Sequence, residues 1–163
     1  MIVVSDTSPI SNLLLAGYLH LLPATFGQVV IPERVMRELM VLETKFGYDL
    51  SQLKSADWLE VKTVTWTDRV QKLKQLLHEG ESEAIALAHE LQADFLLIDE
   101  SEGRAVAEAE GIRAVGVLGL LLEAKNQHLI LEVRVVMDAI IEKSKFWVSS
   151  ALYQQVLQKA GEK

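Results

Sequence analysis

Two aspartates of the chain come directly after short apolar runs. Asp6 follows residues 2–5, and Asp99 follows residues 95–98. Both runs are predicted to be strands of a parallel sheet, and all strands of such a sheet end at one edge, where ligands bind. If the two strands are neighbours, the two carboxylates lie within reach of one cation. Each aspartate by itself also fits a helix N-cap or an Asx turn.

A third acid, Glu38, borders the apolar stripe of a predicted helix. Val35 and Leu42 lie beside it at helical spacing, so its side chain is expected to point sideways towards the core. The alternative is a solvated glutamate that pairs with Arg34 or Arg37 on the same helix. Glu38 is therefore a candidate metal ligand only in combination with the other acids.

Glu81 is the fourth acid, and its spacing is the most informative. Ala84, Ile85 and Ala88 follow it by three, four and seven residues, which places Glu81 on the buried face of a helix. A buried acid requires a partner or a function. The alternative is that Glu81 stabilises the first turn of its helix through the helix dipole. Glu83 lies farther from the centre of the stripe and is the second candidate for this position.

The donor types of these acids predict a particular class of metal. The chain has no cysteine, and its four histidines (His20, His78, His89 and His128) show no paired ligand spacing. Carboxylate oxygens are hard ligands, which select Mg²⁺ or Mn²⁺ over zinc. Such ions activate water and stabilise the attacking and leaving oxygens during phosphodiester cleavage. We therefore expect a metal-dependent reaction at a phosphodiester.

Strands and helices alternate along the chain. The predicted strands cover residues 2–5, 28–31, 58–64, 95–98 and 112–117, and the predicted helices cover residues 9–22, a segment that begins at Pro32, and residues 68–78, 81–92, 103–111, 118–125, 130–142 and 151–160. Ser8 and Pro9 are predicted as N-cap and first residue of their helix, and Gly80 as a break. The alternation predicts an α/β fold whose parallel sheet is covered on both faces.

The composition fits one intracellular domain. The chain has 163 residues, of which 50% are hydrophobic, enough for a single core. We expect one domain over residues 1–163, with a core at about 1–125 and closing helices at about 126–163. Residues 1–6 lack the basic start of a signal peptide, and no apolar run is long enough to span a bilayer. The absence of cysteine agrees with a cytoplasmic location.

The net charge of −7 argues against non-specific electrostatic binding of nucleic acid by the whole surface. An acidic enzyme that binds RNA needs a local basic strip. Arg34, Arg37, Lys72, Lys74 and Arg104 are the candidates, and scattered surface charge is the alternative.

Two other classes of phosphate-handling protein lack support in these residues. A phosphotransferase of the haloacid-dehalogenase type needs a second acid two residues after the first, where this chain has Ser8. A receiver domain needs an acidic pair after the first strand and a lysine after the last. The chain has Thr7 after Asp6, and Val115 followed by Gly116 at the other position.

The order of the acidic motifs resembles a PIN domain over roughly residues 1–125. The matching segments are the strand that ends in Asp6, Thr7 and Ser8, the helix with Glu38, the helix that begins with Gly80 and Glu81, and the strand that ends in Asp99 and Glu100, followed by Gly103 and Arg104. The chain is most similar to a little-characterised prokaryotic PIN-like group.

This resemblance implies a three-layer α/β/α fold with a mostly parallel sheet. It also implies an endoribonuclease that cleaves single-stranded RNA with Mg²⁺ or Mn²⁺, often the toxin of a toxin–antitoxin pair whose partner is a small antitoxin protein. Asp6, Glu38, Glu81 and Asp99 match the catalytic, metal-binding acids. Thr7 or Ser8 matches a hydroxyl that supports the first acid, with Glu100 as a further supporting residue and Arg37 and Arg104 as RNA-binding candidates.

One departure from the family pattern leaves a second function open. The third acid is more often Asp in the family, and Glu83 is an alternative to Glu81 at this place. The alternative function is therefore a catalytically weak or inactive PIN-like module that binds RNA or a protein partner. The apolar residues at 118–122, with Phe146 and Trp147, predict a homodimer or an antitoxin groove. Burial of these residues in the core of the domain is the other interpretation.

Overall fold

A five-stranded parallel sheet organises the chain, and the computed structural model describes all 163 residues. The strands are β1 (Val3–Ser5), β2 (Val29–Pro32), β3 (Leu59–Lys62), β4 (Phe95–Leu97) and β5 (Ala114–Val115), in the spatial order β3-β2-β1-β4-β5. The chain first builds outward from β1 to β3 and then crosses to β4 on the other side. The switch point between β1 and β4 is where ligands bind in such sheets.

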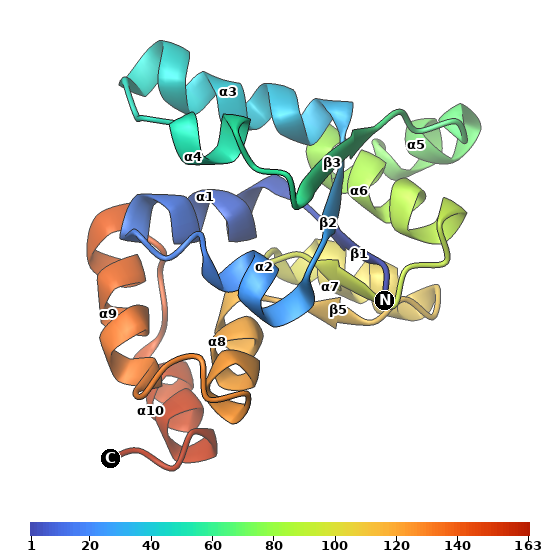
Figure 1. Cartoon of the computed structure of the whole chain (residues 1–163). Coiled ribbons are helices and arrows are strands. Elements are labelled where there is room, and N and C mark those ends of the chain that lie inside the picture. The colour runs from blue at the N-terminus through green and yellow to red at the C-terminus, as the bar shows by residue number, and fades with distance from the viewer.

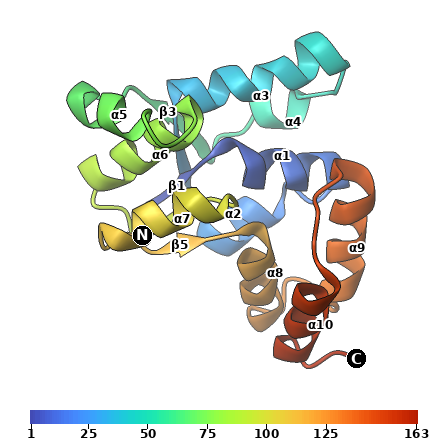
Figure 2. The same cartoon turned by 180° about the vertical axis from the view of Figure 1, so that it is seen from behind.

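Helices cover both faces of this sheet (Figures 1 and 2). They are α1 (Thr7–Ala16), α2 (Leu21–Phe26), α3 (Glu33–Phe46), α4 (Ser51–Lys54), α5 (Thr67–Leu73), α6 (Glu79–Glu90), α7 (Ser101–Ala109), α8 (Val117–Asn126), α9 (Val133–Ser144) and α10 (Ser150–Lys159). One core joins α1, α2, α3, α8, α9 and α10 to the sheet, and a second core joins α5, α6 and α7 to it. The predicted three-layer α/β/α fold is confirmed.

Alternation along the central strands explains why both cores form. Val3 and Leu97 contribute to the first core, whereas Val4 and Leu96 contribute to the second. Side chains of successive strand residues point to opposite faces of a sheet. A strand that is buried on both faces is mainly apolar, which is the pattern that predicted β1 and β4, although β1 ends in the buried Ser5.

The C-terminal helices pack into the first core. Met137 and Ile140 of α9 and Val156 of α10 are buried there together with Val3 of β1. The carboxylate of Glu162 accepts hydrogen bonds from the backbone amides of Val133 (2.8 Å) and Arg134 (3.0 Å) and from Lys125 Nζ (2.9 Å). These bonds tie the end of the chain to α8 and to the start of α9. In both views α9 and α10 lie at the opposite end of the molecule from α5 (Figures 1 and 2).

The predicted helix at residues 9–22 is wrong at both ends. The helix α1 begins at Thr7, and its N-cap is Asp6, with Pro9 as the third helical residue. Proline is tolerated there because the first-turn amides have no partner within the helix. Gly17 ends α1 in the left-handed conformation, with a φ of 84°, and the separate helix α2 follows.

Other boundaries also differ from the prediction. Gly80 does not break a helix but lies in the first turn of α6. The last strand is only Ala114–Val115, because Gly116 is already the N-cap of α8. The short helix α4 was not predicted from the sequence.

The leucine-rich segment does not leave a large apolar surface. Leu120 and Leu121 are fully buried, and Leu118 and Leu122 pack partly against the first core. Of the residues on which the predicted assembly rested, only Trp147 is strongly exposed, with 81% of its surface accessible. The leucines of this segment are therefore fully or partly buried in the core of the domain. No helix is both long and apolar enough to cross a lipid bilayer.

Candidate active site

Asp6 stands at the switch point of the sheet. Its backbone amide donates a hydrogen bond to the carbonyl oxygen of Leu97 (2.8 Å), so the pairing of β1 with β4 continues to this residue. The side chain is 4% exposed. It makes no capping hydrogen bond to α1, and Pro9, at the position whose amide a cap commonly binds, has no N–H. Helix capping therefore does not account for this carboxylate.

Neighbouring acids act on Asp6. Burial is the main cause that raises its pKa from 3.8 to about 7, and the negative charges of Glu81, Glu38 and Asp99 raise it further. The amide of Thr7 opposes this shift. The fold thus brings the four predicted acids into electrostatic contact around one buried carboxylate.

Asp99 is held by two donors. The backbone amide of Val117 donates to Oδ1 (2.7 Å), and Asn12 Nδ2 donates to Oδ2 (3.1 Å). Burial raises the pKa of Asp99, while these two donors and the charge of Arg104 lower it. A Cβ atom at Gly116 would lie 3.1 Å from Oδ1, so the carboxylate passes close to the backbone at the start of α8.

Asn12 was not predicted as a site residue. It is 8% exposed, and it shares a face of α1 with the buried residues Pro9 and Ala16, three residues before it and four after it. A polar side chain on an apolar face is a signal that the sequence contains. Its partner could not be inferred, because Asn12 and Asp99 are separated by 87 positions.

Glu38 accepts a hydrogen bond from one of the two hydroxyls, those of Thr7 and Ser8, that were expected to support Asp6. Thr7 Oγ1 donates to Glu38 Oε2, and the role of the other candidate, Ser8, stays a prediction. Arg34 Nε lies 3.7 Å from Glu38 Oε1, so the predicted surface pairing also exists. A Cβ atom at Gly80 would lie 2.9 Å from the carboxyl carbon of Glu38. Gly80 therefore allows this carboxylate to pack against the first turn of α6.

Glu81 contains an unpartnered buried oxygen. The residue is 5% exposed, and its Oε2 has no hydrogen-bond partner. Burial raises the pKa of Glu81, and the backbone amide of His78 lowers it. A glutamate in the first turn of a helix commonly accepts a hydrogen bond from the amide of the N-cap residue, and the contact with His78 is of this kind. It does not account for the bare Oε2, since buried polar atoms are nearly always paired.

Glu83 lies in a different environment. Burial raises its pKa, and the backbone of Arg34 and the charge of Arg37 lower it. Its charge is not among those that raise the pKa of Asp6, whereas the charge of Glu81 is. Glu83 therefore faces the start of α3, whereas Glu81 packs against α7 and its charge acts on Asp6.

The donor set fits a hard divalent cation in its chemistry. Asp6, Glu38, Glu81 and Asp99 offer only carboxylate oxygens, which Mg²⁺ and Mn²⁺ prefer. The bare Oε2 of Glu81 is an acceptor without a donor, and a cation beside Asp6 would favour its ionised form. No group of three or more acidic or histidine side chains is already close enough to hold a metal ion.

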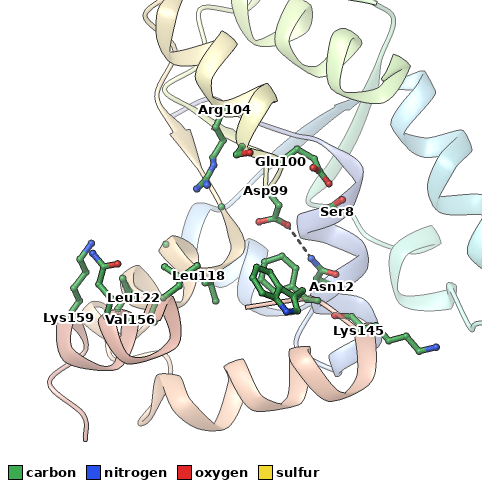
Figure 3. A pocket seen from close by; sticks show the side chains of 18 residues that line it. Ser8, Asn12, Asp99, Glu100, Arg104, Leu118, Leu122, Lys145, Val156 and Lys159 are labelled. Atoms are coloured by element: carbon green, nitrogen blue, oxygen red, sulfur yellow. Dashed lines mark hydrogen bonds between the residues drawn. The ribbon is translucent and has the colours of Figure 1, made fainter. Parts of the chain in front are cut away.

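The other predicted residues lie around this cluster. Ser8, the exposed Glu100 and Arg104 line a groove of about 700 Å³ that begins at Asp99 (Figure 3). Arg37 does not line this groove, because it lies beside Glu79 and Glu83 near the first turn of α6. Lys145, Trp147 and Lys159 also line the groove, and none of them was predicted as a site residue.

Gly103→Ala should reveal how tightly Glu81 is held. A Cβ atom at Gly103 would lie 2.6 Å from Glu81 Oε2 and 2.6 Å from Ile98 Cδ1, both in the interior. Alanine favours a helix by about 1 kcal/mol over glycine, whereas overpacking costs roughly 1–3 kcal/mol. We expect a net decrease in the free energy of unfolding, measured by urea denaturation.

Gly119→Ala in α8 is the matched control for Gly103→Ala. A Cβ atom at Gly119 would meet only Val115 Cγ1, at 3.1 Å, so this variant should change stability much less. A Gly103→Ala variant more stable than the wild type would contradict the placement of Glu81 against α7.

A comparison with known protein families gives a match that extends beyond residue 125, where the resemblance in the acidic motifs ended. One family model, described as a PIN domain, matches residues 2–162. The match includes α9 and α10, which follow the segment over which the acidic motifs showed the likeness. No curated protein matches the chain.

Proposed function

Because this chain belongs to the PIN-domain family, whose members are generally nucleases, we propose that it is an endoribonuclease that cleaves single-stranded RNA with Mg²⁺ or Mn²⁺. Asp6, Glu38, Glu81 and Asp99 are the proposed catalytic acids. The proposed biological role is that of the toxin in a toxin–antitoxin pair.

The observation that carries this proposal is the state of two neighbouring carboxylates. Asp6 is buried with its pKa raised to about 7, and Glu81 beside it has a buried oxygen without a donor. Buried charges are costly unless they are paired or coordinate a metal. A divalent cation bound between these acids would compensate the buried charge of Asp6 and give the unpartnered oxygen of Glu81 a partner.

The residues of the chain would then position the reaction. Val117 and Asn12 orient Asp99 through both of its oxygens, and the Thr7 hydroxyl orients Glu38. Partners of this kind fix the direction of a metal ligand. When bound, a divalent cation supplies activation of water and neutralisation of the charge that develops on the phosphate.

The discriminating measurement is cleavage of a labelled single-stranded RNA by the purified chain. Cleavage should occur with Mn²⁺ or Mg²⁺ and stop in excess chelator. Glu81→Gln should lower the rate at least about ten times more than Glu83→Gln, because ligand changes exceed the roughly 10- to 100-fold losses seen for their supporting residues. Glu83→Gln is the matched control on the same helix.

Two outcomes would contradict parts of this proposal. A larger loss in Glu83→Gln than in Glu81→Gln would assign the third acid to Glu83. If the wild type cleaves no RNA with either metal, the chain is instead a module that binds RNA or a protein without cleaving.

A further inference from the structure

A groove runs from the proposed catalytic acids to the C-terminal helices. Its volume is about 700 Å³. Ser8, Asn12 and Asp99 form its wall at the acid cluster, and Leu122 of α8 and Val156 of α10 lie across from them (Figure 3). The groove is therefore continuous with the site, and one of its sides is built by the segment after residue 125.

Three cations surround this groove in a chain whose net charge is −7. Figure 3 shows Arg104 and Lys159 towards one end and Lys145 at the opposite end, where the side chain of Lys145 points away from Asp99. None of the three cations is in a salt bridge. Arg104 acts on the charge of Asp99, and Lys159 has no acidic partner. Cations gathered beside a groove in an otherwise acidic chain favour a ligand that is itself a polyanion.

Trp147 adds an aromatic surface to the same groove. Its side chain lines the groove and is 81% exposed, the largest aromatic exposure in the chain. The preceding residue, Phe146, packs partly against the first core and so anchors this loop. Nothing in the chain covers the indole ring, and an anchored, open ring next to cations has the properties of a stacking platform for a nucleobase.

Lys145 holds a backbone conformation that glycine normally adopts. It ends α9 with a φ of 58°, in the left-handed region. Five of the nine glycines have this kind of positive φ, and three of these end helices. A lysine at such a position bears a conformational cost, but Gln92 (φ 49°) and His128 (φ 62°), which do not line the groove, have the same kind of conformation. The conformation of Lys145 therefore does not by itself point to a ligand.

We propose that this groove binds the single-stranded RNA substrate, with one unstacked base on Trp147 and backbone phosphates at Arg104 and Lys159. The proposal rests on the proposed function for the choice of RNA as the ligand. A base can lie on the indole only if it has left a double helix, so the groove would also account for selection of single strands. The C-terminal helices thereby become part of the substrate site.

Binding of a fluorescent oligouridylate to the full chain tests this proposal without catalysis. All variants carry Asp6→Asn so that the RNA is not cut, and affinity is measured by fluorescence anisotropy in Ca²⁺. Adding Trp147→Ala should weaken binding about tenfold or more, the range for loss of one base–aromatic stack. Trp147→Phe should retain most of the affinity. Trp66→Ala, an exposed tryptophan beside α5 at the other end of the molecule, is the matched control.

The salt dependence of the same binding tests the cations. Lys159→Gln should reduce the slope of log affinity against log salt by about 0.7, the contribution of one phosphate contact in a single strand. Trp147→Ala should leave this slope unchanged, and so should Lys45→Gln at the exposed end of α3.

Several results would overturn the groove as the RNA site. These are wild-type affinity in both Trp147→Ala and Lys159→Gln, equal affinity for duplex and single-stranded RNA, or no RNA binding at all. The result also separates this inference from the proposed function. Cleavage that needs Asp6 but ignores Trp147 overturns only the groove, whereas groove-dependent binding without cleavage overturns only the nuclease.

Discussion

Replacing Asp6 or Asp99 by asparagine should lower the rate of RNA cleavage at least about a hundredfold. Removing the residues that merely orient a metal ligand costs roughly 10- to 100-fold, so loss of a ligand charge at the centre of the cluster should cost more. Asp6 feels the charges of the other three acids, and Asp99 is oriented by two donors for the same site. The measurement is the single-turnover rate with saturating Mn²⁺.

Loss of folding must be separated from loss of chemistry in these variants. Asparagine has nearly the shape of aspartate. Asp6 makes no capping bond to α1, and asparagine at position 99 keeps an oxygen that can accept from Val117 at the start of α8. The circular dichroism spectra should therefore match that of the wild type. Asp57→Asn, at an exposed acid that forms no salt bridge, is the control and should cleave at the wild-type rate. Wild-type rates in both Asp6→Asn and Asp99→Asn would remove the cluster from the reaction.

In metal-free buffer the wild type should lose stability as the pH rises from about 4 to about 8. The pKa of Asp6 is about 7 in the folded protein and near 3.8 when it is unfolded. Between these values the folded state binds more protons than the unfolded state, so the free energy of unfolding falls with pH. The full cost is present above about pH 7, where ionised Asp6 destabilises the fold by about 4 kcal/mol, from about 1.4 kcal/mol per pKa unit.

Asp6→Asn should abolish most of this decline. In chelator the variant should melt above the wild type at about pH 8, with little difference at about pH 4, where the wild-type Asp6 is protonated. Adding Mn²⁺ at 100 times its dissociation constant should stabilise the wild type by about 2.7 kcal/mol, which is roughly 5 to 10 °C in melting temperature. The variant should lose most of this rise, and an undiminished rise would exclude Asp6 as a principal ligand.

Local patterns in the sequence were sufficient for the layers of the fold and for the positions of the main acids. Short, mainly apolar runs predicted β1 and β4 with an acid after each, because strands buried on both faces are mainly apolar. The spacing from Glu81 to Ala84 and Ala88 predicted a buried acid, because residues at these intervals share one face of a helix. Helix ends were predicted less well. Gly17 ends α1, whereas Gly80 lies inside the first turn of α6, and the difference depends on what surrounds each glycine.

Only the tertiary structure decided which groups meet. Thr7 donates to Glu38 across 31 positions, and Asn12 donates to Asp99 across 87. Periodicity indicates that a side chain faces inward, but its partner depends on strand order and on how helices pack across the sheet. The groove has the same origin, because Trp147 and Lys159 line it together with Asp99 only after α9 and α10 have packed against α1 and α8. Contacts between segments so far apart leave no periodic signal in the chain, and they exist only in the folded core.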